Sequence, residues 1–189
     1  MSSMADKKNL TRRLAEIVGG DAVLADDREL VVYECDAYTL QKNLPTVVVL
    51  PGSAQEVTAV VRLCAELNLP IIPRGAGTSL SGAVLAVDGG VMIALTRMNR
   101  VLAIDPRNRR ALVEAGCVNA WITRDAEKHG LFYAPDPSSQ TACTIGGNIA
   151  NNSGGAHCLK YGVTTNNLLG VRMVLIDGSI IDLGGDYLD

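Results

Sequence analysis

The chain has 189 residues, of which 48% are hydrophobic and 20% are charged, a balance typical of a globular protein and not of a disordered one. The net charge of −3 disfavours nucleic acid as a partner. The uninterrupted apolar stretches are far shorter than the about 20 residues that a membrane-spanning helix needs. Any membrane association is therefore expected to be peripheral, through partners. The absence of a secretory signal pattern favours a cytoplasmic location.

The five cysteines are scattered and form no C-x-x-C pair, and there are only two histidines. Disulfide frameworks and zinc sites depend on closely spaced cysteine or histidine pairs. The sequence therefore predicts reduced thiols and no metal site.

The first part of the chain has the signals of short helices followed by a parallel βαβ unit. We expect a helical segment over residues 1–45, with an amphipathic helix at 9–18 and a second short helix at 26–33. Residues 46–50 are a β-branched run typical of a buried strand. A capping box, Ser53-x-x-Glu56, then opens a helix, and a second strand follows at 69–73.

After Gly90, the sequence pattern changes to short strands separated by turn residues. These strands are predicted at residues 91–95, 101–104 and 111–115, and a helix at 120–129 ends at Gly130. Residues 136–155 form a long glycine-rich stretch without periodicity, which is typical of a functional loop. Residues 170–182 predict a hairpin over Asp177-Gly178. The expected class is α+β, with a small parallel βαβ lobe and a larger mixed, mainly antiparallel lobe.

A glycine-rich segment, Pro73-Arg74-Gly75-Ala76-Gly77-Thr78-Ser79-Leu80-Ser81-Gly82, follows a predicted strand. Glycines let backbone N–H groups approach a ligand, and hydroxyl groups add donors, so this composition favours a pyrophosphate site. The segment is not a Walker A loop, because Ala83 stands where lysine is required, and Leu80 breaks the Rossmann glycine pattern. A turn that merely reverses the chain is the structural alternative.

A second segment combines small polar residues and glycines between residues 135 and 155. By itself this composition is equally typical of an ordinary surface loop. However, Ile145, Ile149 and Ala150 make its middle too apolar for a solvated loop. A buried glycine-rich segment of this kind favours a flat or narrow ligand that lies against the backbone.

These segments, together with His157-Cys158-Leu159-Lys160-Tyr161-Gly162 and Asn167-Leu168-Leu169, resemble a known family. Residues 46–182 resemble the FAD-binding domain of the vanillyl-alcohol oxidase and p-cresol methylhydroxylase type. Within that type, the chain is similar to the FAD-linked 2-hydroxyacid dehydrogenases, the group that includes the D subunit of bacterial glycolate oxidase. The resemblance implies an FAD-binding domain over residues 46–189 that is incomplete at its C-terminus and lacks the cap domain for substrate.

The resemblance also implies which residues bind FAD. The diphosphate would be bound by Arg74, Gly75, Ala76, Gly77, Thr78 and Ser79, with Gly82 and Ala83 closing the turn. Pro135 and Ser139 would flank the cofactor, Thr144, Gly146 and Gly147 would line the ribityl and isoalloxazine region, and Asn151, Ser153, Gly154 and Gly155 would lie near the ring. Because the diphosphate loop contains no histidine, the FAD is expected to be non-covalent.

The activity that the resemblance implies is oxidation of a small 2-hydroxy acid, glycolate or D-lactate, by hydride transfer to FAD. The catalytic base would lie outside this chain, and electrons would pass to other oxidase subunits, including an iron–sulfur subunit. Alternatives are D-lactate or D-2-hydroxyglutarate dehydrogenase, a more distant reductase of the same fold, or a non-catalytic fragment that binds FAD or a partner. A phosphate-binding protein without flavin would require the segment 136–155 to be exposed.

Single residues outside these motifs have structural as well as functional interpretations. His157 could face substrate, although a hydrogen bond to a loop carbonyl is the commoner arrangement. His129 ends a predicted helix, where a cation suits the helix dipole. Trp121 is expected in the core.

Overall fold

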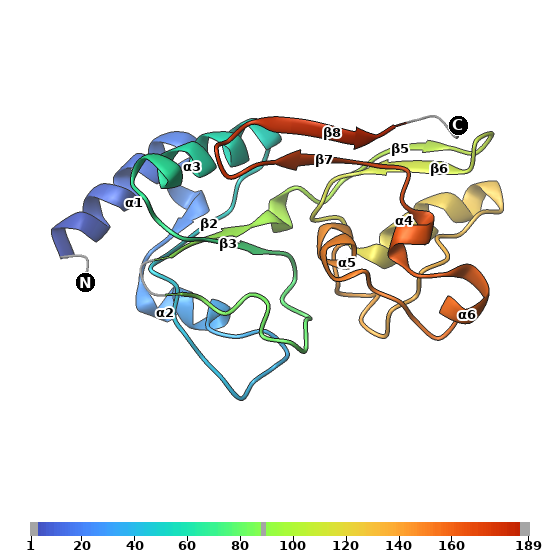
Figure 1. The fold of residues 1–189 in the computed structure, drawn as a ribbon, viewed down its shortest axis with the longest axis horizontal. Helices are drawn as coiled ribbons and strands as arrows, with labels where there is room; N and C mark the ends of the chain where they lie inside the picture. Colours follow the sequence, from blue (N-terminus) through green and yellow to red (C-terminus); the bar gives the residue numbers. More distant parts are fainter. Residues whose placement is uncertain (1–3, 88–89, 186–189) are drawn as a thin grey trace. The chain divides into compact units, whose positions relative to one another are not determined.

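The computed structural model describes residues 4–87 and 90–185, which form two compact units (Figure 1). Unit 1 comprises Met1–Arg97 and Arg172–Leu183, and unit 2 comprises Met98–Val171 and Gly184–Asp189. The mixture of helices with parallel and antiparallel strands confirms the α+β class. Within the described residues, every helix is too short or too polar to cross a membrane.

The sheet of unit 1 has the strand order β1(Val23–Leu24), β2(Val47–Val49), β4(Val91–Ala94) and β3(Ile71–Arg74). Strand β4 lies parallel to both neighbours, with Met92 opposite Val48 on one side and Ile72 on the other. The sequence analysis assigned residues 91–95 to the antiparallel lobe, and this is wrong. All four residues of β4 are buried, and a continuous apolar run of this kind suits the centre of a parallel sheet covered on both faces.

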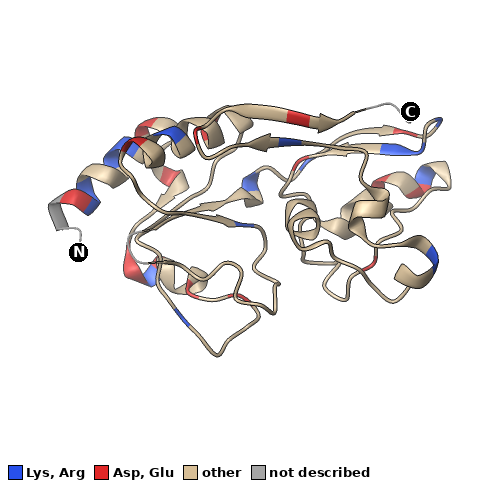
Figure 2. Ribbon diagram, viewed as in Figure 1, with Lys and Arg blue, Asp and Glu red and all other residues tan. Residues whose placement is uncertain are grey.

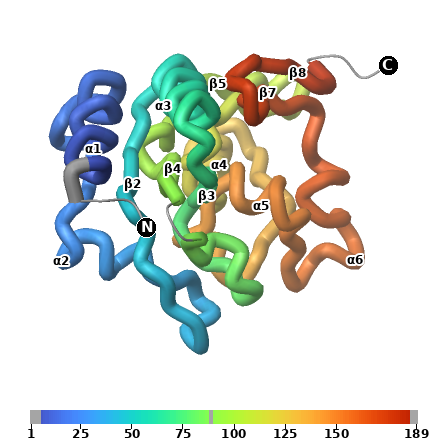
Figure 3. Tube along the Cα trace, turned by 60° about the vertical axis from the view of Figure 1, so that its left-hand side comes forward, coloured from blue at the N-terminus to red at the C-terminus, as the bar shows by residue number. Residues whose placement is uncertain are grey.

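Alternation along the strands divides the core of unit 1 into two faces. Val47, Val49, Val91 and Ile93 face a cluster formed with α1(Met4–Val18) and α3(Ala54–Glu66), which lie on the same side of the sheet (Figures 1 and 3). The intervening strand residues pack in a second cluster with Leu30 of α2(Asp27–Leu30) and with Tyr33 of η2(Val31–Tyr33). The expected short helix at 26–33 is thus one α-helical turn followed by a 3₁₀ turn.

Helix α3 begins at the predicted capping residues. The Glu56 N–H donates to the Ser53 side-chain oxygen over 3.2 Å. The Glu56 carboxylate accepts from the Gly52 N–H over 2.8 Å, one residue before the position that a standard capping box uses. Both contacts satisfy backbone N–H donors at the start of the helix. They explain why α3, which connects β2 to β3, begins at this point.

Unit 2 is built on the antiparallel pair β5(Val101–Asp105) and β6(Arg110–Val113). Helix α4(Asn119–Ala126) continues into η4(Glu127–His129), and Gly130 ends it with a left-handed φ of 69°, as predicted. The core consists of Cys117, Ile122 and Ile145, and Trp121 and Tyr133 pack against it partly buried. Trp121 also lies beneath the Arg124 guanidinium, 5.2 Å from the ring centre.

The stretch 136–155, predicted to be an aperiodic loop, contains helix α5(Ile145–Asn151). The short elements α6(Cys158–Tyr161) and η5(Thr164–Asn167) follow it. Gly146 and Gly147 have low helix propensity, so the sequence did not predict α5. Tertiary contacts override that preference, because the Ile145 N–H donates to the Cys117 carbonyl oxygen over 2.9 Å and the Gly146 N–H donates to that of Ala115 over 2.8 Å.

The chain then forms the predicted hairpin, β7(Gly170–Val174) and β8(Ile180–Gly184). Gly178 has a φ of 76° at the turn, and the Ser179 N–H donates to the Asp177 carboxylate over 2.8 Å. Val174 packs against the core of unit 1. Two further 3₁₀ turns, η1(Gly20–Ala22) and η3(Leu95–Arg97), complete the described elements.

Candidate functional site

Arg74, the last residue of β3, directs its side chain into unit 1. Only 8% of the residue is exposed, and its Nη1 donates to the Cys35 carbonyl oxygen over 2.9 Å. The guanidinium also lies over the Tyr33 ring, 5.4 Å from the ring centre. Burial lowers the pKa of Arg74. Its charge is therefore engaged with the segment 33–37, and contact between Arg74 and a diphosphate stays a prediction.

The loop after β3 contains two positions where the backbone requires glycine. Gly77 has a φ of 71°, and a Cβ at this position would lie 2.3 Å from Nη2 of Arg74. Its carbonyl oxygen accepts from the Ala37 N–H over 3.1 Å. Gly82 also has a φ of 71°, and Leu85 would lie 3.0 Å from its Cβ. The buried arginine and these glycines together set the path of the loop.

The remaining residues of this loop present small groups at or near the surface. Thr78 and Ser79 are half-buried, Gly75 is half-buried, and Ala76 and Ala83 are exposed. The Ser79 hydroxyl lies 2.8 Å from that of Ser81 and accepts from the Ser81 N–H over 3.2 Å. The loop thus combines hydroxyl groups with a backbone free of large side chains, apart from the exposed Leu80.

In unit 2, the segment that begins at Pro135 is attached to the start of α4. Pro135 is fully buried, and its carbonyl oxygen accepts from the buried Asn119 Nδ2 over 3.2 Å. The carbonyl oxygen of Ser139 accepts from the N–H groups of Ala142 and Cys143, each over 2.8 Å. Pro135 is thus held by α4, and Ser139 by the turn that leads to Cys143.

The two glycines of α5 have different surroundings. A Cβ at Gly146 would lie 3.0 Å from the Ala115 carbonyl oxygen, so this glycine packs closely against the chain leaving β6. A Cβ at Gly147 would meet only the Thr144 side-chain oxygen, at an ordinary 3.5 Å. Helix α5 also carries no charged residue (Figure 2). Gly147 thus leaves room beside an uncharged backbone.

The chain leaving α5 is fixed by backbone contacts. Asn151 is exposed, and its Nδ2 donates to the Gly147 carbonyl oxygen over 3.0 Å. The Ser153 carbonyl oxygen accepts from the backbone and the hydroxyl of Thr164, over 3.0 and 2.7 Å. A Cβ at Gly154 would lie 3.0 Å from Val163, and one at Gly155 would lie 2.1 Å from the carbonyl oxygen of Asp136.

A hydrogen-bonded pair that the sequence analysis missed joins Asp136 to His157. The His157 Nδ1 contacts the Asp136 Oδ2, and the His157 N–H faces the Asp136 Oδ1 over 3.3 Å. The hydrogen bond to the imidazole lowers the pKa of Asp136. His157 thus bonds a carboxylate rather than a loop carbonyl. The two residues are 21 positions apart, and no local sequence signal connects them.

The FAD binding domain family matches residues 45–184, which include both glycine-rich segments. The chain belongs to this family. It is 45% identical over 184 residues to the glycolate oxidase subunit GlcD of Escherichia coli K12, covering 97% of this chain and 37% of the relative. It is 43% identical over 143 residues to a D-lactate dehydrogenase of Anaerostipes hadrus, covering 76% of this chain and 30% of the relative. The chain thus spans 37% and 30% of the lengths of these two relatives.

The fold of this FAD binding domain also matches a solved structure of p-cresol methylhydroxylase. The TM-score is 0.83 at 21% identity, covering 95% of this chain and 36% of the other. At this identity the similarity shows the fold alone. It confirms the fold type expected from the sequence.

Buried polar atoms in unit 2 show that the family's cofactor fits this chain. Thr144 and Asn148 are only 3% and 2% exposed, and the Thr144 Oγ1 and Asn148 Nδ2 have no hydrogen-bond partner among the described residues. Thr144 is the N-cap of α5, and the spacing of four places Asn148 on the same side of the helix. The Thr144 Oγ1 lies 3.5 Å from a Cβ built at Gly147. Buried polar groups rarely remain unpaired, so these atoms fit a polar ligand such as the ribityl chain of FAD. The sequence analysis included Thr144 but missed Asn148. Asn148 lies on the same side as Thr144 only because residues 145–151 form a helix, which the sequence analysis did not predict.

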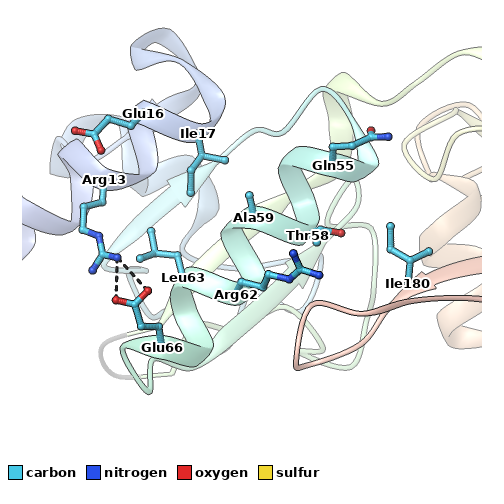
Figure 4. Close-up of a pocket in the computed structure, with 10 residues that line it drawn as sticks. All are labelled: Arg13, Glu16, Ile17, Gln55, Thr58, Ala59, Arg62, Leu63, Glu66 and Ile180. Atoms are coloured by element: carbon cyan, nitrogen blue, oxygen red, sulfur yellow. Dashed lines mark hydrogen bonds and ion pairs between the residues drawn. The ribbon is translucent and has the colours of Figure 1, made fainter.

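Two hollows lie elsewhere on the units. A groove of about 560 Å³ in unit 1 is lined by α1, α3 and Ile180, and the Arg13–Glu66 ion pair crosses one end (Figure 4). None of the predicted FAD-binding residues lines it. A hollow of about 330 Å³ in unit 2 is lined by Tyr133, Tyr161 and the Asp136–His157 pair among others. Among the described residues, no group of three or more potential ligand side chains is arranged to hold a metal ion.

Proposed function

We propose that this chain is the FAD-binding part of an enzyme that oxidises a small 2-hydroxy acid, glycolate or D-lactate. The 45% identity to a glycolate oxidase subunit over nearly the whole chain is the observation that carries this proposal. The unpaired polar atoms of the buried Thr144 and Asn148, the first of them beside Gly147, support it from the structure. A phosphate-binding protein without flavin would require residues 136–155 to be exposed. The burial of Cys143, Thr144, Ile145 and Asn148 within this stretch argues against it.

FAD, when bound, supplies a hydride acceptor for the α-hydrogen of the substrate. The role of this chain is to bind and orient that group. The N–H groups and hydroxyls of residues 75–79 bind the diphosphate, with Gly82 and Ala83 closing the turn. Thr144 and the backbone at Gly146 and Gly147 hold the ribityl and ring region, while Pro135, Ser139 and residues 151–155 flank it. The base that accepts the hydroxyl proton lies outside this chain.

The FAD is held without a covalent bond. The loop from Arg74 to Ala83 contains no histidine that could attach to the flavin. Cys143 is buried at 4% exposure, on the turn that precedes α5. Release of the flavin on denaturation is therefore expected.

The enzyme transfers its electrons through other subunits, including an iron–sulfur subunit, and acts in the cytoplasm. The name of the most identical relative described above, a glycolate oxidase subunit, supports an assembly with partner subunits. D-lactate dehydrogenase activity is a second candidate, favoured by the 43% identity to such an enzyme.

Titration of FAD into the chain, followed by flavin fluorescence and visible absorption, tests the proposal. We expect saturable binding that Gly147→Val abolishes, because the added side chain fills the open position while meeting only the Thr144 oxygen at 3.5 Å from its Cβ. Gly20→Ala is the matched control, since nothing lies within 4 Å of its added Cβ. A cooperatively folded chain that binds no FAD would overturn the proposal.

A further inference from the structure

The Asp136–His157 pair connects two segments that the proposed function assigns to FAD. Pro135 and Ser139 lie on the first segment, and Ser153, Gly154 and Gly155 lie on the second. We propose that His157 is a positioning residue, which holds these two segments together in the geometry that binds FAD. This inference rests on the proposed function and extends it to Asp136 and His157, which the sequence analysis did not assign to FAD.

Each segment is anchored to a different part of unit 2. The first is attached to α4 through the bond from Asn119 to the Pro135 carbonyl oxygen, at 3.2 Å. The second is attached to η5 through Thr164, whose backbone and hydroxyl both donate to the Ser153 carbonyl oxygen. These anchors are themselves connected, because the side chain of Tyr133, two residues before Pro135, is hydrogen-bonded to Thr164. Direct contacts between the two segments add to this connection.

The described residues show direct contacts of this kind at Asp136. The backbone of Gly155 packs so closely that an added Cβ would lie 2.1 Å from the Asp136 carbonyl oxygen and 2.3 Å from its Oδ1. The His157 N–H faces the same Oδ1, and the imidazole Nδ1 contacts Oδ2. The close packing of Gly155 against Asp136 prevents the two segments from moving closer together, but it does not prevent them from moving apart. The imidazole and N–H contacts supply the attraction.

The surroundings of the pair favour this role. The Asp136 side chain is 20% exposed and that of His157 is 67% exposed, so the carboxylate is the sheltered member. The titratable groups nearby are Tyr133 and Tyr161, which line the same hollow, and Lys160 and Cys158, which follow on α6. The Lys160 ammonium lies over the Tyr161 ring, 4.9 Å from its centre, and is engaged there. Asp136 is therefore the carboxylate that orients His157.

The test compares His157→Leu, which removes the ring donor, with His157→Asn, which keeps an N–H donor near the position of Nδ1. A charge-assisted hydrogen bond of this kind corresponds to about a 10-fold change in an equilibrium constant. We expect His157→Leu to weaken FAD affinity about 10-fold and His157→Asn to restore most of it. His129→Leu is the matched control, because His129 is exposed at the end of η4.

Amide hydrogen exchange of the FAD-free chain provides a readout that is independent of flavin. We expect faster exchange at residues 153–157 in His157→Leu and in Asp136→Ala, with the exchange of α4 unchanged. Unchanged exchange, or unchanged FAD affinity in His157→Leu, would overturn the positioning role while leaving the proposed function intact. If the unsubstituted, folded chain binds no FAD, the proposed function fails, and the positioning role for FAD fails with it.

Discussion

The two glycine-rich segments share a composition but use glycine for different physical reasons. In the loop after β3, Gly77 and Gly82 have φ values of 71°, a conformation that other residues rarely adopt. In unit 2, Gly146, Gly147 and Gly155 do not have positive φ values. A Cβ at Gly146 would be tight against Ala115 at 3.0 Å, and the backbone of Asp136 leaves no room for one at Gly155. The first segment therefore depends on a backbone conformation and the second on close packing.

This difference separates glycines that maintain the fold from a glycine that is available to a ligand. Gly77 lies against Arg74, Gly146 against Ala115, and Gly155 against Asp136. Gly147 alone among these four has space beside it. A glycine-rich sequence therefore does not by itself show which glycine a cofactor approaches, whereas the surroundings of each Cβ position do.

Gly155→Ala and Gly147→Ala form the pair that tests this contrast most strongly. The added methyl at Gly155 would lie 2.1 Å from the Asp136 carbonyl oxygen, and we expect it to lower the free energy of unfolding. Overpacking against backbone of this kind costs about 3 kcal/mol. The same change at Gly147 should raise the free energy of unfolding by about 0.5 kcal/mol, because alanine favours a helix. Urea unfolding followed by circular dichroism measures both, and equal effects would contradict the distinction.

Arg74→Met tests whether the loop of unit 1 depends on the buried guanidinium. The substitution leaves the Cys35 carbonyl oxygen without its donor, which should lower the free energy of unfolding by about 2 kcal/mol. Arg74→Lys should recover little of this, since an ammonium cannot reproduce the planar contact with the Tyr33 ring. Arg107→Met, at an exposed turn, is the control. Thermal unfolding measures these effects, and an unchanged melting temperature in Arg74→Met would show that the arginine does not support the loop.

Two buried thiols compare the cores of the two units. Burial raises the pKa of Cys64 in unit 1 and of Cys117 in unit 2 from 9.0 to about 11. In the unfolded chain these thiols ionise near their ordinary value of 9.0, whereas in the folded chain they stay protonated up to about 11. The free energy of unfolding should therefore decrease as pH rises above 9.

Thiol labelling at pH 8 resolves the two units separately. The exposed Cys158 should react first, and Cys64 and Cys117 only when their unit opens. Mass spectrometry of the labelled peptides gives the order in which the cysteines react. Rapid labelling of Cys64 or Cys117 in the folded chain would contradict the burial that raises their pKa.

Local signals in the sequence predicted the elements whose causes are local. The capping residues Ser53 and Glu56 begin α3, Gly130 ends the α4–η4 helix, and Asp177-Gly178 turns the β7–β8 hairpin. Strand β4 and helix α5 were misassigned because their causes are not local. The place of β4 in the sheet depends on partners in β2 and β3, and α5 depends on bonds to the chain that leaves β6.

The amino-acid sequence by itself determined the α+β class, the two glycine-rich segments and membership of the FAD binding domain family, because these follow from composition, periodicity and motif order along the chain. Only the tertiary structure decided that β4 is central to the parallel sheet, that the Arg74 guanidinium is bound by backbone carbonyls, and that the Thr144 and Asn148 side chains are buried with an unpartnered polar atom each. It also joined Asp136 to His157. Each of these features arises from contacts between residues far apart in sequence, and no local preference encodes such contacts.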